Sequence, residues 1–336
     1  MFFYGYYDKC IPDNPTCFQN NDPLWYGWSD QMYTIPVLEP LNQASGNALI
    51  HTQPIDYSDH GFLRISEGID DTQFHFPGTR YQNWSQANDI WFQGLFGVYW
   101  ADDTLGGTID TDGIASLNES PSYGIKTGQP FFVLNLLEEL DIPGEWYLDR
   151  SVGIMNFWPP AALDGSEIVV ALLEEPLLLI NDTAHIYFQD ITFEEGRADL
   201  VNVTNGVDIR VSSCTIRNTG ATGIKIHGNN NSINDCHVYN TGADGVWIKR
   251  GERTSLTDGN NIVSNCEIYN FGRLDRTYHP GVSLNGVGNS AVHNEIHNAP
   301  HGAILITGND NFIQYNEISN VVQEANDAGA IYIGRD

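Results

Sequence analysis

The most regular feature of the chain is a short strand-like triplet that recurs six times after residue 185. Each copy ends in an apolar residue, and successive copies lie 23, 22, 30, 28 and 22 residues apart. The copies are Ile191-Thr-Phe193, Cys214-Thr-Ile216, Cys236-His-Val238, Cys266-Glu-Ile268, Asn294-Glu-Ile296 and Asn316-Glu-Ile318. Two positions later stands Glu195, and then an asparagine in every further copy: Asn218, Asn240, Asn270, Asn298 and Asn320. Because amide side chains stacked at one turn can hydrogen-bond from coil to coil, we expect an asparagine ladder here.

A second pattern consists of apolar residues two positions apart, the spacing of a strand with one buried face. The pairs are Val201 and Val203, Ile224 and Ile226, Val246 and Ile248, Val282 and Leu284, Ala303 and Leu305, and Ala330 and Tyr332. In five coils a glycine precedes the pair (Gly223, Gly245, Gly281, Gly302 and Gly329), as a sharp corner requires. Leucine-rich repeats would show a leucine motif and a helical stretch, and neither is present. The two patterns together predict an all-β fold, a right-handed parallel β-helix.

The first 160 residues differ from the rest of the chain. They are rich in Trp, Tyr and turn residues and show no repeat, although runs such as Phe131-Phe-Val-Leu-Asn135 are strand-like. We expect a β-rich N-terminal module over residues 1–160 and the β-helix over residues 161–336. The segment Trp158-Pro159-Pro160 marks the junction, since two prolines cannot continue a central strand.

Composition and charge narrow the classes of partner. The chain has 15 Lys and Arg against 43 Asp and Glu, a formal net charge of -28. A field of this sign repels nucleic acid and anionic membranes, and no apolar stretch is long enough to span a bilayer. A neutral partner or a metal cation fits better. No basic start followed by an apolar run marks a secretory signal in this N-terminus.

The five cysteines are too few for a disulfide framework. Cys214, Cys236 and Cys266 recur inside the repeats, where we expect buried free thiols. Cys10 and Cys17 either close a local disulfide or remain two free thiols. Five glycosylation sequons (Asn83, Asn118, Asn181, Asn202 and Asn230) are compatible with secretion, but asparagine-rich turns also create such triplets by chance.

Candidate chemistry gathers at the corner between each ladder asparagine and the glycine of the next strand. Equivalent corners of a solenoid stack about 4.8 Å apart, so polar residues of successive coils form one surface. The corner is short in early coils and expands to residues 271–280 and 321–328 in later ones. It carries Asp244, Arg273, Asp275, Arg276, Tyr278, His279, His301, Glu324 and Asp327. Acid–base groups beside sugar hydrogen-bonding groups predict a functional site, whereas any single corner Asp, Asp244 included, is commonly a turn cap.

Metal binding is the lesser expectation. Glu267, Glu295 and Glu317 form an outward column that could attract a cation, but the Asp-rich spacing of calcium loops is absent, and a solvated face is the simpler interpretation. We therefore expect no metal site and no cofactor.

Several segments resemble bacterial-type right-handed parallel β-helix proteins, and glycoside hydrolase family 141 in particular. The resemblance covers residues 60 to 336. It is carried by Leu136-Leu-Glu-Glu-Leu-Asp-Ile-Pro-Gly-Glu-Trp-Tyr-Leu-Asp-Arg150, Phe157-Trp-Pro-Pro160, Arg276-Thr-Tyr-His-Pro280, Ala299-Pro-His301 and Asp327-Ala-Gly-Ala-Ile-Tyr332 through Gly334-Arg-Asp336. It implies activity on fucosides or xylan. Because family members begin with earlier coils and continue past this motif, it also implies a chain that lacks both ends, with a β-helix incomplete at its C-terminal end.

The resemblance places one catalytic carboxylate on Asp327 and its partner beyond Asp336. We expect His301 and His279 to orient this carboxylate or bind sugar hydroxyls, with Arg276 and Tyr278 lining the subsite; Arg273, Asp244 and Glu324 are further substrate-binding candidates. The geometric expectation is that Asp327 faces a groove within hydrogen-bond or near-contact range of His301, since these corners stack about 4.8 Å apart. The alternative is that Asp327 only caps its turn.

The favoured function is a glycoside hydrolase acting on a plant or algal cell-wall glycan, with an oligo- or polysaccharide as partner and a secreted location. A polysaccharide lyase or epimerase would instead need a base such as His or Tyr and a cation to neutralise a uronate. The net charge weighs against a uronate polymer, although a local Arg pair could overcome it. A non-catalytic glycan-binding or structural β-helix is the third hypothesis.

Overall fold

The computed structural model describes residues 62–334, except 85, 142, 160, 161 and 164–166. It also describes the strands β1 (Phe2–Tyr6) and β2 (Met32–Thr34), which pair antiparallel. The two alternatives for Cys10 and Cys17 lie outside the described residues. The chain divides into two compact units, residues 3–169 and residues 170–336 with residues 1 and 2. The strand β12 (Glu167–Ala171) spans this division.

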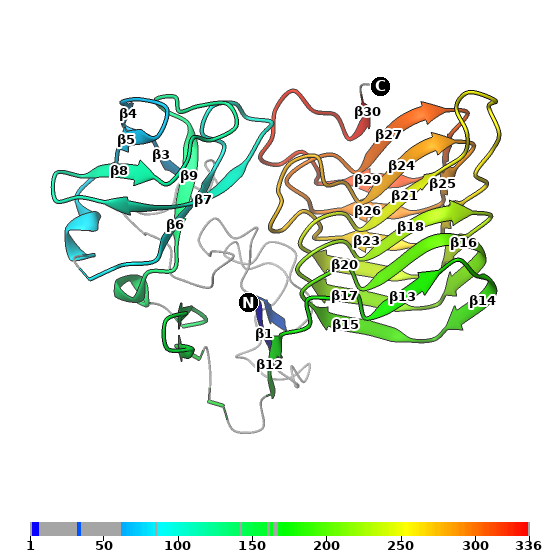
Figure 1. Ribbon diagram of the computed structural model, residues 1–336, viewed down its shortest axis with the longest axis horizontal. Coiled ribbons are helices and arrows are strands. Elements are labelled where there is room, and N and C mark those ends of the chain that lie inside the picture. The colour runs from blue at the N-terminus through cyan, green and yellow to red at the C-terminus, as the bar shows by residue number, and fades with distance from the viewer. Residues whose placement is uncertain are drawn as a thin grey trace. The chain divides into compact units, whose positions relative to one another are not determined.

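The second unit is a stack of parallel strands in two sheets, which confirms the predicted β-helix (Figure 1). The larger sheet contains β13 (Leu178–Asn181), β14 (Ala184–Gln189), β16 (Val201–Ser212), β18 (Ile224–Asn229), β19 (Ser232–Asn234), β21 (Val246–Arg250), β22 (Ile262–Ser264), β24 (Val282–Val287), β25 (Ser290–Val292), β27 (Ile304–Asn309), β28 (Phe312–Gln314) and β30 (Ile331–Ile333). The six-stranded sheet contains β15 (Thr192–Gly196), β17 (Thr215–Thr219), β20 (His237–Thr241), β23 (Glu267–Tyr269), β26 (Glu295–His297) and β29 (Glu317–Ser319). Each strand pairs with its equivalent in the next coil.

The triplet repeat forms the six-stranded sheet and points its apolar residue into the solenoid. Register pairs Phe193, Ile216, Val238, Ile268, Ile296 and Ile318 in one column. The four central members of this column are fully buried, and Ile318 is partly buried against the same core. Cys214, Cys236 and Cys266 are buried free thiols, as predicted. The core is therefore built from one apolar residue per coil at each of a few stacked positions.

The predicted asparagine ladder is present. Asn218 donates to Glu195, Asn240 to Asn218, and Asn270 to Asn240, at 3.0, 3.1 and 3.3 Å, and Asn320 donates to Asn298 at 3.3 Å. Every ladder residue has a φ between +48° and +65°, a conformation that Asn tolerates better than most residues. The asparagines thus both make the corner and hold adjacent coils together.

The predicted core-facing apolar pairs are confirmed in the first four coils and are wrong in the last two. Val282 pairs with Ile304, which pairs with Ile331, so Ile304 and Ile306 face the core while Leu305 lies in the outward register. Because side chains alternate across a strand, a slip of one residue exchanges the two faces. Tyr332 consequently lies on the outer face of β30 rather than in the core.

The close spacing of adjacent coils explains why the corner before β21 needs a glycine, Gly245. A Cβ placed on Gly245 would lie 2.6 Å from the carbonyl oxygen of Gly281 and 2.7 Å from Ile268 Cγ2. The φ of Gly245 is not in the left-handed region. Close backbone approach between coils, and not an unusual φ, therefore excludes a side chain at this corner.

The first unit contains a seven-stranded antiparallel sheet, which confirms a separate β-rich module. In spatial order its strands are β3 (Leu63–Arg64), β9 (Pro130–Leu134), β6 (Ile90–Gly94), β7 (Asp103–Ile109), β8 (Ile114–Leu117), β5 (Gln73–His75) and β4 (Glu67–Gly68). Its described residues also form the hairpin of β10 (Trp146–Asp149) and β11 (Ile154–Phe157) and the short 3-10 helices η2 (Arg80–Asn83) and η3 (Leu137–Glu139). Phe74, Phe92, Phe96 and Phe131 pack together in its core.

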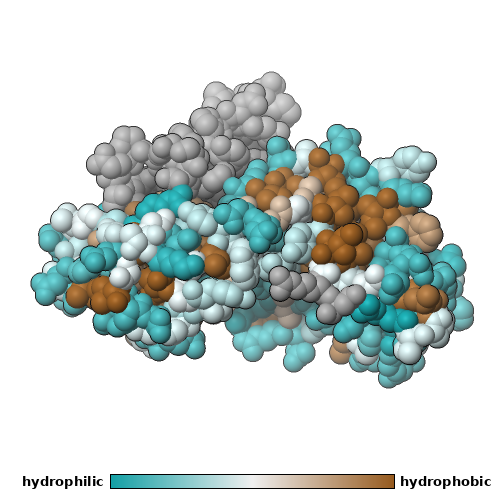
Figure 2. All heavy atoms as spheres, turned by 90° about the horizontal axis from the view of Figure 1, so that it is seen from above, coloured by the Kyte–Doolittle hydropathy of each residue, from teal (hydrophilic) through white to brown (hydrophobic). Residues whose placement is uncertain are grey.

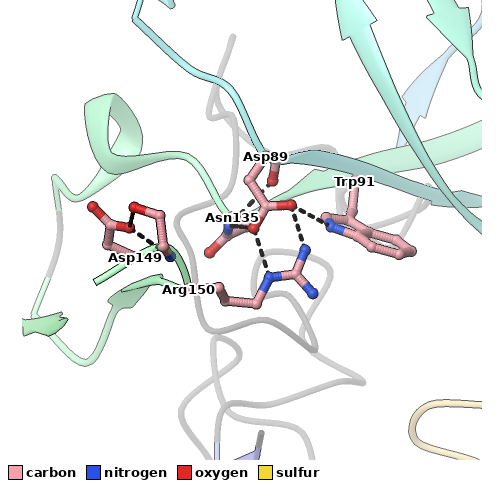
Figure 3. A network of polar contacts seen from close by, with 6 residues as sticks. Asp89, Trp91, Asn135, Asp149 and Arg150 are labelled. Carbon is pink, nitrogen blue, oxygen red and sulfur yellow. Dashed lines mark hydrogen bonds and ion pairs between the residues drawn. The ribbon is translucent and has the colours of Figure 1, made fainter. Parts of the chain in front are cut away.

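The run at residues 136–150, which carries part of the family resemblance, makes structural contacts within this unit. Glu139 accepts a 2.5 Å hydrogen bond from Trp84 Nε1 and pairs with Arg80 at 2.6 Å. Figure 3 shows the other end of the run, where Arg150 pairs with Asp89, which also accepts from Trp91 Nε1 at 3.0 Å. The charged residues that carry the family resemblance here are therefore committed to internal contacts.

The described strands β28 and β30 expose apolar side chains. Phe312, Ile331 and Ile333 are 57%, 47% and 75% exposed, and Figure 2 shows hydrophobic residues gathered on the part of the solenoid seen from above. Among the described residues, no helix has the length and apolar character needed to cross a membrane.

Candidate functional site

The corner that precedes β18, β21, β24, β27 and β30 brings together groups that are distant in sequence. The long loop before β24 carries His279, whose Nδ1 lies 2.7 Å from Oδ2 of Asp244, at the corner of the preceding coil. Gly223 N donates to the Asp244 carbonyl, which fixes the corner of Asp244 against the coil before it. The loop therefore folds back onto the earlier corner and creates a carboxylate–histidine pair.

Asp244 and His279 differ in environment. The Asp244 side chain is 8% exposed, whereas the His279 side chain is 34% exposed. Burial raises the pKa of Asp244, and its hydrogen bond with His279 opposes this shift. His279 Nε2 also lies 4.0 Å from Asp275, whose side chain is exposed. A buried carboxyl group of raised pKa behind an accessible imidazole is an arrangement suited to proton transfer.

Asp199 and Lys225 extend this site and were not identified from the sequence. Asp199 accepts hydrogen bonds from Thr222 N at 3.2 Å and Asn202 Nδ2 at 3.0 Å, and its carboxylate lies 3.9 Å from Lys225 Nζ. Lys225 also lowers the pKa of Asp244, against the larger effect of burial. Lys225 thus acts electrostatically on both carboxyl groups. The repeat did contain a signal, because Asp199, Thr222 and Asp244 each stand two residues before the first core residue of their strand.

Asp199 and Asp244 lie two coils apart. Leu200 N donates to the Thr222 carbonyl and Gly223 N to the Asp244 carbonyl, so the three corners stack in order. At about 4.8 Å per coil, their backbones are about 10 Å apart. Side chains that lean toward each other from corners two coils apart can bring their carboxyl groups within the roughly 6.5–9.5 Å of inverting glycosidases.

Arg276 and Glu324 form a buried ion pair. Their side chains are 4% and 5% exposed, Arg276 Nε donates to Glu324 Oε2 at 2.6 Å, and Nη2 contacts Oε1. Arg276 also donates to the carbonyl of Arg273 at 3.2 Å, and Arg273 itself is buried. The pair joins the loop before β24 to the loop before β30, and substrate binding by Arg273, Arg276 and Glu324 stays a prediction.

Tyr278, His301 and Tyr332 form an aromatic group on the later corners. The Tyr278 ring lies 4.9 Å from the His301 ring and 6.3 Å from the Tyr332 ring. His301 is 2% exposed and Tyr278 39% exposed. Tyr278 therefore presents its ring to solvent, and His301 lies beneath it.

Asp327 is exposed and has a φ of +53°. Among the described residues its carboxylate makes no hydrogen bond or ion pair, and both its catalytic role and its nearness to His301 stay predictions.

The glutamate column stacks as expected, with Glu267, Glu295 and Glu317 in register. Glu267 pairs with His237 at 2.8 Å and lies 3.6 Å from His297. The described residues contain no group of three or more His, Cys, Asp or Glu side chains placed to hold a metal ion.

Comparison with known proteins agrees with this architecture. Residues 175–278 match the family described as the right handed beta helix region. Among solved structures, one described as a glycoside hydrolase is similar with a TM-score of 0.65 and 16% identity, over 88% of this chain and 66% of that chain. The chain thus spans just under two thirds of that protein's length.

Two further similarities are weaker. A pectate lyase gives a TM-score of 0.27 at 12% identity, over 46% of this chain and 52% of that one. The tailspike protein of a Pseudomonas phage gives 0.24 at 11% identity, over 81% and 46%. A search of curated proteins found no match. The family match and the similar structure together show that the second unit is a right-handed parallel β-helix.

Proposed function

We propose that the chain is part of a glycoside hydrolase that binds a cell-wall glycan at the corner before β18, β21 and β24. The observation that carries this proposal is the pair of buried Asp244 and accessible His279 at 2.7 Å. When the Asp244 carboxyl proton moves to His279 Nδ1, the imidazole can give up its Nε2 proton to a leaving glycosidic oxygen.

Asp199 supplies the second carboxyl group. Its side chain is 16% exposed and is oriented by hydrogen bonds from Thr222 N and Asn202. In this proposal the Asp244–His279 pair is the general acid, and Asp199 activates a water molecule on the opposite side of the sugar. The two-coil separation favours inversion.

The resemblance at residues 276–280, 299–301 and 327–336 supports the same reaction class, and so does the fold of the similar glycoside hydrolase. Fucosides and xylan are the first substrates to test, and a cell-wall substrate implies a secreted protein. Asp327 remains a second candidate for a catalytic carboxylate, because its exposed side chain is accessible to a ligand.

A polysaccharide lyase is the second candidate function. It is favoured by one observation, that the accessible member of the pair is a histidine while Lys225 acts electrostatically on the buried Asp244. A histidine base could abstract a proton beside a uronate carboxylate while Lys225 neutralises that carboxylate.

The test is an assay of the full chain on a panel of neutral and uronic polysaccharides. Reducing ends and the absorbance of unsaturated uronates are recorded together. We expect new reducing ends without unsaturated products, and NMR of the first product should show inverted anomeric configuration. Unsaturated products would establish the lyase reaction, and binding without any product would establish a non-catalytic β-helix; either result would overturn the hydrolase proposal.

A further inference from the structure

Two basic residues and a histidine lie together where β18 and β21 end: His227 and Lys249 are on the outer face, and Arg250, the last residue of β21, reaches His227. Ile226 pairs with Ile248 in register, so the next residues, His227 and Lys249, are neighbours across the two strands. Arg250 follows Lys249 and donates from Nη1 to His227 Nε2 at 3.3 Å. Lys249 is exposed and Arg250 half-buried.

Lys249 and Arg250 form no ion pair with a carboxylate among the residues that the structure describes. Other arginines do: Arg150 with Asp89, Arg197 with Glu174, Arg210 with Asp208, Arg217 with Glu194 and Arg276 with Glu324. In a chain with a net charge of -28, two adjacent cations without a carboxylate partner form a local site for an anion.

His227 supports the same interpretation. Because Arg250 donates to its Nε2, the imidazole is an acceptor there and is uncharged. Burial lowers the pKa of His227, and the charges of Arg250 and Lys249 lower it further. The uncharged histidine therefore orients the guanidinium group and leaves its positive charge available to an anion.

The cations adjoin a surface suited to a sugar ring. Trp247 stands two residues before Lys249 and on the same face of β21, about 6.6 Å away along the strand. The Trp247 ring has Lys225 Nζ 5.4 Å from its centroid, and Lys225 lies 3.9 Å from Asp199. A continuous strip therefore runs from the proposed catalytic corner over Trp247 to Lys249 and Arg250.

We propose that Lys249 and Arg250 bind a carboxylate or sulfate substituent of the glycan, so that the substrate is an acidic polysaccharide. This rests on the proposed function only for the placement of a glycan on this face. It extends the proposal from a neutral cell-wall glycan to an anionic one, because the local field at this strip is opposite to that of the whole chain.

The test measures binding and not turnover. Calorimetry of the full chain compares oligogalacturonate with its methyl ester, and dextran sulfate with dextran. Lys249→Gln and Arg250→Gln are compared with Lys126→Gln, which removes one positive charge from the other unit. We expect each strip variant, Lys249→Gln or Arg250→Gln, to weaken binding of one acidic glycan at least tenfold and binding of its neutral counterpart less than twofold. The acidic glycan whose binding is weakened identifies the recognised group as a carboxylate or a sulfate.

Three results would overturn the inference. The first is equal binding of acidic and neutral glycans by the wild type, and the second is a loss of acidic-glycan binding in Lys126→Gln as large as in the strip variants. The third is displacement of the acidic glycan by an equal amount of double-stranded DNA, which would indicate non-specific polyanion binding. If the strip variants lose their selectivity for the acidic glycan but the wild type hydrolyses no glycan, only the hydrolase proposal is refuted.

Discussion

Asp244→Asn is expected to lower the turnover of a hydrolysed glycan by about 100- to 10,000-fold, the usual contribution of a positioned acid–base group. The asparagine amide keeps a hydrogen bond within reach of His279 Nδ1 but cannot carry the transferable proton. Initial rates at saturating substrate measure the effect. Asp310→Asn is the control, because Asp310 is an exposed carboxylate at the other end of β27 and has a φ of +53°.

The difference in the free energy of unfolding between the wild type and Asp244→Asn is expected to depend on pH. Burial raises the pKa of Asp244 in the folded chain, so its ionised form is penalised there relative to the unfolded chain. The stability of the wild type relative to Asp244→Asn is therefore greatest below the ordinary carboxyl pKa and falls as the pH rises through the raised pKa. Denaturant unfolding of both proteins at acidic and neutral pH measures this difference.

Asp327→Asn completes the comparison. If Asp327→Asn abolishes turnover while Asp244→Asn retains it, the catalytic carboxylate is Asp327 and the assignment to Asp244 is wrong. If Asp244→Asn is less stable than the wild type at every pH and its activity falls only in step with that loss of stability, Asp244 is a structural cap.

Arg276→Gln is expected to lower the free energy of unfolding by about 3–5 kcal/mol, because it leaves the buried Glu324 carboxylate without its cation. Urea unfolding measures the loss. The control is Arg210→Gln, which removes an exposed arginine from a pair with Asp208 and should change the free energy of unfolding little, because water screens the pair. The double variant Arg276→Leu with Glu324→Leu should recover much of the lost stability, since no buried charge then remains.

A cost for Arg276→Gln no larger than that of Arg210→Gln would show that the loop pair does not hold the coils together. A raised KM with unchanged stability would instead place Arg276 in the substrate subsite, as the sequence resemblance implies.

The coils could be predicted because their requirements repeat. Ile216, Val238, Ile268 and Ile296 occupy one stacked position, and each needs an apolar side chain. The ladder asparagines needed both a left-handed φ and an amide, which few other residues supply. Such constraints recur once per coil and are visible without a structure.

The register of the last coils and most site contacts could not be predicted. The run Ala303-Ile-Leu-Ile306 is apolar on both faces, so alternation does not identify the buried one. His279 meets Asp244 across 35 residues, and Arg276 meets Glu324 across 48. Those contacts depend on how two irregular loops fold back, and irregular loops carry no period.

The measurement that tests the central claim most directly is an NMR titration of histidine-labelled protein with a glycan that the panel shows to bind. His279 lies at the proposed site, whereas His237 lies on β20 in the other sheet and pairs with Glu267. We predict saturable shifts of the His279 imidazole resonances, with those of His237 unchanged. In Asp244→Asn, the signals that report the proton shared with His279 should no longer respond. Shifts confined to His237, or saturable binding that leaves His279 unaffected, would contradict a glycan site at the Asp244–His279 corner.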